Sequence, residues 1–252
     1  MQSVEQTEVE ALQQHISVLQ QQLTEAQRMT AMGELVSTTT HEFNNVLMSI
    51  LNYAKMGLRH KDEATRDKAL QKIHDAGERA AKITNSVLGM ARNRTNQMEP
   101  TNLAELVDSS LVLLEREMTK YRISVDRDFQ DAPPILANGN QLQQVVLNLL
   151  INARQAMPDG GQLIIRISPD SAQGTVDLMV RDNGCGIPQD KLRHIFDAFY
   201  STKSGPDETG KGGTGLGLSA CRNIVESHNG RIRVQSSVGK GTAFTIKLPV
   251  AT

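Results

Sequence analysis

The stretch from Gly205 to Ser219 reads GPDETGKGGTGLGLS, and six of its fifteen residues are glycine. It leads directly into a segment that we predict to be helical, residues 216–228. Main-chain N–H groups at the start of a helix have no partner within it, and glycine leaves them accessible to a phosphate chain. Lys203 and Lys211 would add positive charge. A mobile surface loop has the same composition, so the stretch alone leaves both interpretations open.

Two known phosphate-binding motifs overlap this stretch, and neither fits. A P-loop needs a buried strand before its first glycine and Ser or Thr after its lysine, whereas Gly212 follows Lys211 and FDAFYSTKS precedes the stretch. A dinucleotide fingerprint needs a strand before it and an acid about twenty residues later, but residues 233–238 read RVQSSV. A phosphate-binding loop here would therefore belong to another kind.

The composition of the chain excludes several classes of protein. A length of 252 residues suffices for one large domain or two small ones. The formal charge of −1 and an aromatic content of 3% argue against a nucleic-acid partner. The only cysteines, Cys185 and Cys221, exclude a disulfide framework and a thiolate metal cluster. Without a signal peptide or an apolar run of about 18 residues, we expect a cytoplasmic chain with no direct membrane contact, or the cytoplasmic part of a membrane-bound sensor.

The first third of the chain is predicted to be helical. An apolar repeat over residues 9–26 has the heptad spacing of a dimeric coiled coil, with a solitary amphipathic helix as the alternative. A second repeat predicts a helix to about Leu58, and a third predicts another helix after the polar turn HKDEATRD. Two such helices form a hairpin, and two hairpins form a four-helix bundle, so we expect a homodimer. The second and third repeats are Val36, Thr40, Phe43, Leu47, Ile50 and Ala54, then Ile73, Ala76, Ala80, Ile83, Val87 and Met90.

A polar segment without periodicity, RNRTNQMEPTN, predicts a linker, which we place at residues 95–101. The remainder of the chain mixes predicted helices with segments of period-two alternation, which is typical of strands. This pattern predicts a mixed, mostly antiparallel sheet with helices on one face, and hence an α + α/β two-domain chain. The predicted helices are 103–118, 141–157 and 216–228, and the predicted strands are 163–167, 176–180, 231–234 and 244–248.

Three further segments carry polar residues in special positions. In NLLINARQA, Asn148 and Asn152 lie one turn apart on one face of an otherwise apolar predicted helix, where a structural hydrogen-bond network is the alternative. RDNGCGIP, residues 181–188, ends a strand in a carboxylate and two glycines, which alone indicates a tight turn. VGKGTAF, residues 238–244, enters the final strand.

In this order and spacing the segments resemble the four ATP-binding boxes of the histidine-kinase ATPase domain, over about residues 102–250. That fold is shared with gyrase, the large heat-shock chaperones and the mismatch-repair ATPases. The resemblance implies ATP and Mg²⁺ as ligands, with Asn152 binding the metal through its side-chain oxygen and Asn148 beside it near the phosphates. It also implies that Asp182 accepts a hydrogen bond from the adenine amino group, which would favour adenine over guanine.

The same resemblance assigns further nucleotide-binding residues. Gly184 and Gly186 would let the main chain approach the nucleotide, Ile187 would line the purine pocket, and Thr242 would support Asp182. Gln155 stands where many relatives have a basic residue, so the two lysines would neutralise more of the phosphate charge. The glycine-rich segment would close over the phosphates, anchored by Phe196 and Phe199, and its predicted binding residues are Lys203, Lys211, Gly213, Thr214, Gly215, Leu216, Gly217 and Leu218.

The segment HEFNN, residues 41–45, resembles the phosphoacceptor motif in the dimerisation domain of sensor histidine kinases. At about 100° per residue, the apolar stripe lies roughly 180–240° from His41, so we expect His41 and Asn45 on the opposite, exposed face. A neutral imidazole is a good nucleophile near pH 7, and its attack on the γ-phosphate gives a phosphoramidate. Glu42 could take the ring proton or fix the tautomer, and Asn45 could orient a water that dephosphorylates the partner.

Two other positions qualify this resemblance. Val46 stands where many relatives have proline, which removes the kink that proline would cause. Relatives that hydrolyse ATP use a Glu four residues before the magnesium-binding Asn, whereas Asn148 cannot take a proton. We therefore expect a histidine, not water, to accept the phosphoryl group. The remaining histidines are expected to be solvated and to form no metal site: His15, His60, His74, His194 and His228.

The sequence thus resembles the catalytic core of a sensor histidine kinase of a two-component system. Expected partners are a second copy of the chain, a response-regulator receiver domain that docks near Met48 and Leu58, and an upstream sensor domain outside this chain. Two alternatives stay open: a soluble ATPase of the same fold, and a phosphatase-only or adaptor scaffold. The predicted domains are a coiled-coil signalling helix at 1–30, a dimerisation and histidine phosphotransfer domain at 31–94, the linker at 95–101, and a catalytic ATP-binding domain at 102–252.

Overall fold

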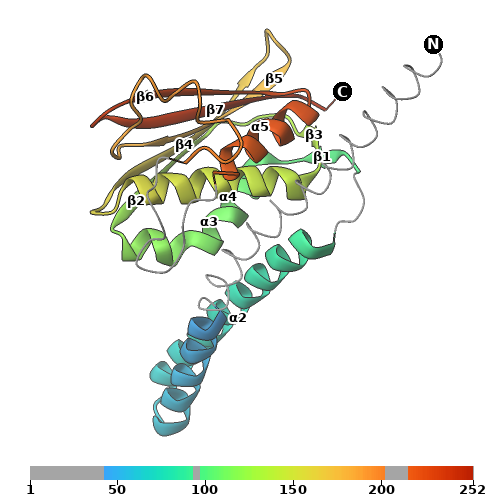
Figure 1. Cartoon of the computed structure of the whole chain (residues 1–252). Coiled ribbons are helices and arrows are strands. Elements are labelled where there is room, and N and C mark those ends of the chain that lie inside the picture. The colour runs from blue at the N-terminus through green and yellow to red at the C-terminus, as the bar shows by residue number, and fades with distance from the viewer. Residues whose placement is uncertain (1–42, 93–96, 202–214, 252) are drawn as a thin grey trace, which may run out of the picture.

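The structure, a computed structural model, describes residues 43–92, 97–201 and 215–251, without the side chains of residue 82 and residues 85–92. The predicted coiled coil at residues 1–30 lies outside this range. Figure 1 shows a long helical hairpin that projects from a layered domain, in which three helices cover one face of a sheet. This arrangement confirms the predicted fold class of a helical hairpin followed by an α/β sandwich.

The hairpin pairs a helix over residues 43–59 with α2 (Glu63–Arg92). At the turn between them, Oδ1 of Asp62 accepts a hydrogen bond from the Thr65 N–H at 2.8 Å, which caps the start of α2. Buried side chains from both helices lie along the hairpin. The predicted apolar face of the second helix is confirmed at Ala76 and Ile83, while Val87 and Met90 lie outside the described side chains.

The first helix of the hairpin buries a different side from the one predicted. Phe43 and Leu47 of the predicted stripe are 39% and 41% exposed, whereas Val46 is only 5% exposed. Within one chain, Phe43 and Leu47 of the predicted stripe are therefore exposed, whereas Ile50 and Ala54 are half-buried. Large exposed apolar side chains of this kind indicate a surface that another chain covers. Those of the hairpin are Phe43, Leu47, Met48, Leu51, Leu58 and Leu70.

The main sheet of the second domain has five strands in the order β2-β4-β5-β7-β6. Strand β2 is parallel to β4, and every other neighbouring pair is antiparallel, which confirms a mixed, mostly antiparallel sheet. A second, two-stranded sheet pairs β1 with β3. The bounds are β1 (Glu99–Thr101), β2 (Ile123–Phe129), β3 (Ile135–Ala137), β4 (Gly161–Asp170), β5 (Thr175–Asp182), β6 (Arg231–Ser237) and β7 (Gly241–Pro249).

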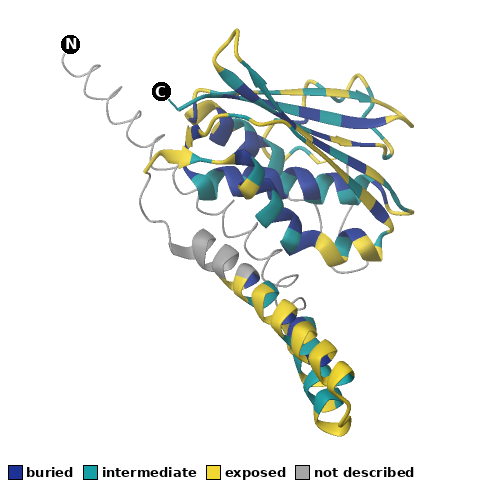
Figure 2. Ribbon diagram, turned by 180° about the vertical axis from the view of Figure 1, so that it is seen from behind, coloured by how far each residue is buried: buried dark blue, intermediate teal, exposed yellow. Residues whose placement is uncertain are grey.

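Three helices pack against one face of this sheet: α3 (Leu103–Lys120), α4 (Gly139–Ala156) and α5 (Gly217–Ser227). The strands bury every second residue, such as Leu163 and Ile165 in β4, and Figure 2 shows the buried residues gathered between the sheet and the helices. Burial of each such side chain contributes about 1.5–3 kcal/mol. The first main-chain N–H groups of α3 and α4 also have hydrogen-bond partners. The side chains of Asn102 and Asn138 cap these helices and each accept two such N–H bonds.

Three strands were not predicted. Strands β1 and β3 have three residues each, too few to display a period of two, and β1 occupies the last three positions of the predicted linker. Strand β2 lies at the edge of the sheet, where one side is open, and its sequence ISVDRDF has exposed charged residues on successive positions. None of the described helices has the length and apolar character that crossing a membrane requires.

The prediction for His228 was wrong, because this residue is buried and 2% exposed. Its Nε2 accepts the main-chain N–H of Asn138 at 3.0 Å, so Nδ1 carries the hydrogen and donates to the Ile224 carbonyl at 2.7 Å. The ring therefore joins the end of α5 to the start of α4. His60, His74 and His194 are exposed as predicted, and His15 lies outside the described residues.

Candidate nucleotide-binding site

A cavity of about 360 Å³ lies between α4, the end of β5 and the start of α5. Its size and its mixture of apolar and polar walls are typical of a small-molecule site. The fold brings together here segments that are far apart in the sequence. Among the predicted site residues, those that line the cavity are Asn148, Asn152, Asp182, Gly186, Ile187, Gly215, Gly217, Leu218 and Thr242.

Asp182 is the buried carboxylate of this cavity, with an exposed fraction of 4%. Its Oδ1 accepts the main-chain N–H of Gly184 at 2.9 Å and that of Thr242 at 3.2 Å. Burial raises the pKa of Asp182 above its ordinary value, and these two N–H bonds act in the opposite direction. Because both bonds go to Oδ1, Oδ2 is available to a donor in the cavity.

Gly184 and Gly186 are required by the protein's own main chain. Gly186 has a φ of +71°, and a Cβ at this position would overlap the carbonyl of Ser237. A Cβ at Gly184 would overlap the carbonyl of Ala156. We predicted these glycines to admit a nucleotide, and the structure shows a separate requirement for them in the close approach of the end of β5 to α4 and β6. Gly184 does not line the cavity.

Asn148 and Asn152 are both half-buried on the cavity side of α4. Nδ2 of Asn148 donates to the Gly217 carbonyl at 3.3 Å, which joins α4 to the first turn of α5. Asn152 makes no hydrogen bond with its side chain among the described residues, so its amide oxygen is free for a ligand. No group of three or more His, Cys, Asp or Glu side chains that could hold a metal occurs in the described part of the chain.

These features fit Mg²⁺ that is bound together with a nucleotide. Mg²⁺ is usually held by one or two protein oxygens plus substrate phosphates and water, and it rarely has an all-protein cage. The Asn152 amide would supply one such oxygen, and the start of α5 lies across the same cavity. Main-chain N–H groups without a partner at the start of a helix favour the binding of phosphate.

Two family profiles match the chain. Residues 31–96 match the His Kinase A (phospho-acceptor) domain, and residues 137–252 match the histidine kinase-, DNA gyrase B-, and HSP90-like ATPase. The chain belongs to the sensor histidine kinases. This kinase is similar to the sensor kinase CckA of Brucella abortus (strain 2308), at 35% identity over 92% of this chain and 25% of that protein. It is also similar to the histidine-protein kinase AtoS of Escherichia coli (strain K12), at 32% identity over 92% of this chain and 37% of that protein.

Solved structures of histidine kinases are similar to the kinase as well. The catalytic domain of ThkA has 28% identity and a TM-score of 0.53, and the match covers 61% of this chain and 95% of that one. ThkA in complex with the response regulator TrrA has 26% identity and a TM-score of 0.52, and the match covers 89% of this chain and 63% of that one. The kinase chain spans less than two fifths of the length of CckA and AtoS.

One hydroxyl behind the cavity, that of Ser236, was missed in the sequence. Oγ of Ser236 on β6 accepts the Ile187 N–H at 2.8 Å and lies 2.9 Å from Oγ1 of Thr242. The same Oγ donates to the Gly241 carbonyl at 2.9 Å. The only available signal was the alternation of β6, which places Ser236 on the same side as Ile232 and Val234.

The two predicted phenylalanine anchors of the glycine-rich segment differ. Phe196 packs edge-on against Phe244, with ring centres 6.4 Å apart, and the Arg222 guanidinium lies 5.8 Å from the Phe196 ring. Phe199 is 68% exposed, so its side chain does not act as a predicted anchor. Its main chain, with a φ of +66°, instead passes so close to Gly215 that a Cβ there would overlap it.

Several predicted residues cannot be placed in the kinase structure or lie outside the cavity. His41, Glu42, Lys203, Lys211, Gly213 and Thr214 lie outside the described residues. Leu216 precedes α5, where its carbonyl accepts the Ala220 N–H at 3.0 Å and the Ser219 hydroxyl at 2.9 Å. It does not line the cavity.

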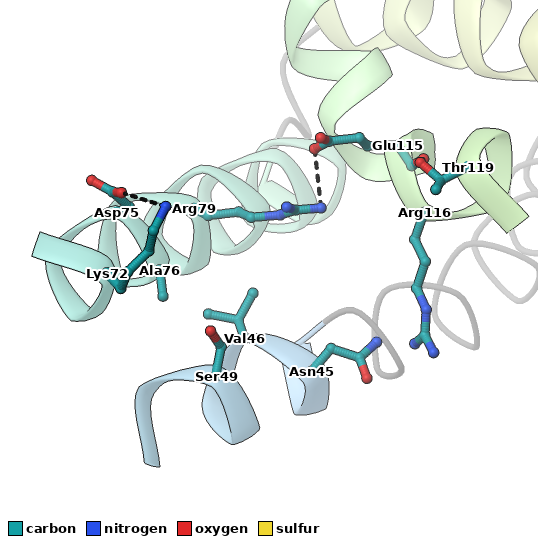
Figure 3. Close-up of a pocket in the computed structure, with 10 residues that line it drawn as sticks. All are labelled: Asn45, Val46, Ser49, Lys72, Asp75, Ala76, Arg79, Glu115, Arg116 and Thr119. Carbon is teal, nitrogen blue, oxygen red and sulfur yellow. Dashed lines mark hydrogen bonds and ion pairs between the residues drawn. The ribbon is translucent and has the colours of Figure 1, made fainter. Parts of the chain in front are cut away.

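Asn45 lines a second cavity, of about 450 Å³, between the hairpin and α3 (Figure 3). We predicted it to be exposed, but it is half-buried and its Nδ2 is buried. Arg79 of α2 and Glu115 of α3 close the opposite side with an ion pair of 3.0 Å. In Figure 3 the side chains of Asn45 and Arg116 extend into the same space.

Proposed function

We propose that this chain is the catalytic core of a sensor histidine kinase that binds Mg-ATP in the 360 Å³ cavity and transfers the γ-phosphoryl group to His41. The phosphoryl group then passes to an aspartate of a response-regulator receiver domain. The observation that carries the proposal is the buried Asp182, held by Gly184 and Thr242 in the cavity that Asn152 also lines.

The walls of the cavity suit the parts of ATP. Oδ2 of Asp182 would accept a hydrogen bond from the adenine amino group, while Ile187 and Phe244 supply apolar surface. Gly217 and Leu218 belong to the start of α5, where N–H groups would face the phosphates. Mg²⁺, when bound, neutralises phosphate charge. Lys203 and Lys211 would add to this neutralisation from the glycine-rich segment.

The proposed acceptor is His41, which lies four residues before Asn45 in the sequence. A ring nitrogen of the neutral imidazole attacks the γ-phosphorus, the bond to the β-phosphate oxygen breaks, and ADP leaves. Glu42 takes the ring proton or fixes the tautomer. Hydrolysis is disfavoured because Asn148 cannot act as a base, and its amide is already bonded to the Gly217 carbonyl.

The apolar surface of the hairpin supports a homodimer. Phe43, Leu47 and Leu51 are between 39% and 52% exposed in the single chain, and a second hairpin would cover them to complete a four-helix bundle. At about 100° per residue, Leu58 lies about 60° from Phe43 and falls on the same side. Met48, which is 57% exposed, then remains as the predicted contact for a receiver domain beside Asn45.

The test is incubation with Mg²⁺ and γ-labelled ATP, comparing the chain with its His41→Gln variant. Label that is acid-labile and base-stable, and that is absent from the variant, supports the kinase. Phosphate release that is equal in both proteins would instead indicate the soluble ATPase. Nucleotide binding with neither product would favour the scaffold.

A further inference from the structure

We propose that the Ser236 hydroxyl sets the direction of the Thr242 hydroxyl hydrogen and thereby makes the cavity select adenine over guanine. This inference rests on the proposed function, because it requires that the cavity binds a purine nucleotide. Ser236 does not line the cavity, so its role is that of a positioning residue acting through Thr242.

Three groups surround Oγ of Ser236 at hydrogen-bond distance. The Ile187 N–H lies at 2.8 Å, the Gly241 carbonyl oxygen at 2.9 Å, and Oγ1 of Thr242 at 2.9 Å. A serine hydroxyl has one hydrogen to donate and two lone pairs that accept. Three neighbours therefore use its full hydrogen-bonding capacity.

The chemistry of two neighbours decides the direction of the third bond. A main-chain N–H can only donate, so Ile187 uses one lone pair of Ser236. A carbonyl can only accept, so Gly241 takes the single hydroxyl hydrogen. The contact with Thr242 is then a hydrogen bond only if Thr242 donates. If Ser236 instead donated its hydrogen to Thr242, the Gly241 carbonyl oxygen would face a lone pair of Ser236 at 2.9 Å, and two acceptors would repel each other.

The consequence is a cavity wall that only accepts hydrogen bonds from a ligand at this end. The hydrogen of the Thr242 hydroxyl is directed to Ser236, which leaves Oγ1 with lone pairs. The Thr242 N–H is also occupied, because it donates to Oδ1 of Asp182. Both Asp182 and Thr242 line the cavity, and both then present acceptors to it.

An accepting wall distinguishes the two purines. Adenine carries an amino donor at the position where guanine carries a carbonyl acceptor. A free threonine hydroxyl can rotate and donate to a guanine carbonyl, so by itself it would discriminate poorly. Ser236 prevents this rotation, and a guanine carbonyl would then meet unpaired acceptors, which is the strongest means of rejecting an analogue.

The experiment measures dissociation constants for ATP and GTP by calorimetry, with Mg²⁺, in the whole chain. For Ser236→Ala we expect the preference for ATP over GTP to fall at least about tenfold, because Thr242 regains a free donor. Ser237→Ala is the matched control, since Ser237 is the adjacent, exposed serine of the same strand, and it should keep the wild-type ratio. Ser236→Thr retains the hydroxyl and should also keep the ratio.

A double mutant separates hydrogen direction from structural damage. Thr242→Val removes the hydroxyl that Ser236 directs, so adding Ser236→Ala to this variant should leave the ATP-to-GTP ratio unchanged. If Ser236→Ala weakens ATP and GTP equally, or leaves the ratio as in the wild type, the inference is wrong. Should Ser236→Ala fail to fold, Ser236→Cys provides a weaker acceptor for the Thr242 hydroxyl at similar size, and an unchanged ratio there overturns the inference equally. Absence of any nucleotide binding by the wild-type chain would instead refute the proposed function.

Discussion

The main-chain N–H of Asn138 donates to Nε2 of His228 at 3.0 Å, although the two residues are 90 positions apart in the sequence. Asn138 is the N-cap of α4, and His228 follows the last residue of α5. Both helices border the nucleotide cavity. One buried ring therefore joins the two helices that contribute Asn148, Asn152 and Gly217 to the cavity, in addition to the bond from Asn148 to the Gly217 carbonyl.

Replacement of His228 should destabilise the ATPase domain. His228→Ala leaves the buried N–H of Asn138 without an acceptor and also creates a void, so the free energy of unfolding should fall by about 2–4 kcal/mol. Urea denaturation followed by circular dichroism measures this loss. His194→Ala is the control, because His194 is exposed, its ring pairs with Asp197 on the surface, and its other ring contact is with Tyr200 at 5.9 Å between ring centres. Equal losses in the two variants would contradict the structural role of His228.

Asp182→Asn should raise the thermal stability of the folded protein at pH 7. Burial raises the pKa of Asp182 in the folded state, so the folded protein binds this proton more tightly than the unfolded chain does. The ionised carboxylate thus lowers stability at pH values above the folded pKa, and this loss disappears below the unfolded pKa. We expect the variant to unfold at a higher temperature than the wild type at pH 7, with the difference vanishing in acid.

The same variant should lose nucleotide affinity. At pH 7 we expect ATP to bind at least about tenfold more weakly, or about 1.4 kcal/mol, because an amide N–H₂ replaces the acceptor Oδ2. Wild-type affinity should decline as the pH falls through the raised pKa of Asp182, starting at a higher pH than for an ordinary aspartate. Calorimetry over a descending pH series checks this, and the Asn variant should lack the part of the decline that is due to Asp182. Parallel profiles for the two proteins would exclude Asp182 from base recognition.

Asn152→Ala should abolish the magnesium dependence of nucleotide binding. The side chain lines the cavity and bonds to no other described residue, so its loss should leave α4 intact. In the wild type, removal of Mg²⁺ with a chelator should weaken ATP binding, whereas in the variant it should have little further effect. Unchanged, Mg²⁺-dependent affinity in the variant would remove Asn152 from the metal site.

The two cysteines should react very differently with a maleimide. Cys185 is exposed and lines the cavity, while Cys221 is fully buried and its burial raises the pKa of the thiol to about 12. We expect one labelled site per chain, absent from Cys185→Ser, and protected at least about tenfold by saturating Mg-ATP. Labelling at the same rate with and without the nucleotide would mean that ATP does not occupy this cavity.

The dimer should depend on the exposed stripe of the first hairpin helix. Leu47→Asp places a charge in a surface that a second hairpin would bury, so we expect the dimer dissociation constant to rise at least about 100-fold, or about 2.8 kcal/mol. Analytical ultracentrifugation over a concentration series measures it. Leu136→Asp is a suitable control, because Leu136 on β3 is 47% exposed and belongs to the other domain. A Leu47→Asp chain that remains dimeric would place the interface elsewhere.

Much of the architecture could be predicted from the sequence because it depends on one-sided burial. Alternating apolar residues indicate which side of β4, β5 and β7 packs against the core, and the apolar face of α2 does the same for that helix. The binding motifs were also readable, since Asn152, Asp182 and Thr242 occur in short segments with a characteristic order. The structure brings these three residues to one cavity.

Other features depended on contacts between distant segments. Strand β1 forms only because β3 pairs with it, and Asn45 is half-buried beside a cavity that residues of α2 and α3 also line. Nothing in the sequence around His228 or Ser236 reveals a partner, since their hydrogen bonds reach residues 90 and 49 positions away. The sequence by itself determined most of the elements and most of the polar residues that line the site. Only the tertiary structure decided which donor faces which acceptor, because hydrogen bonds are directional and form between groups that folding alone brings together.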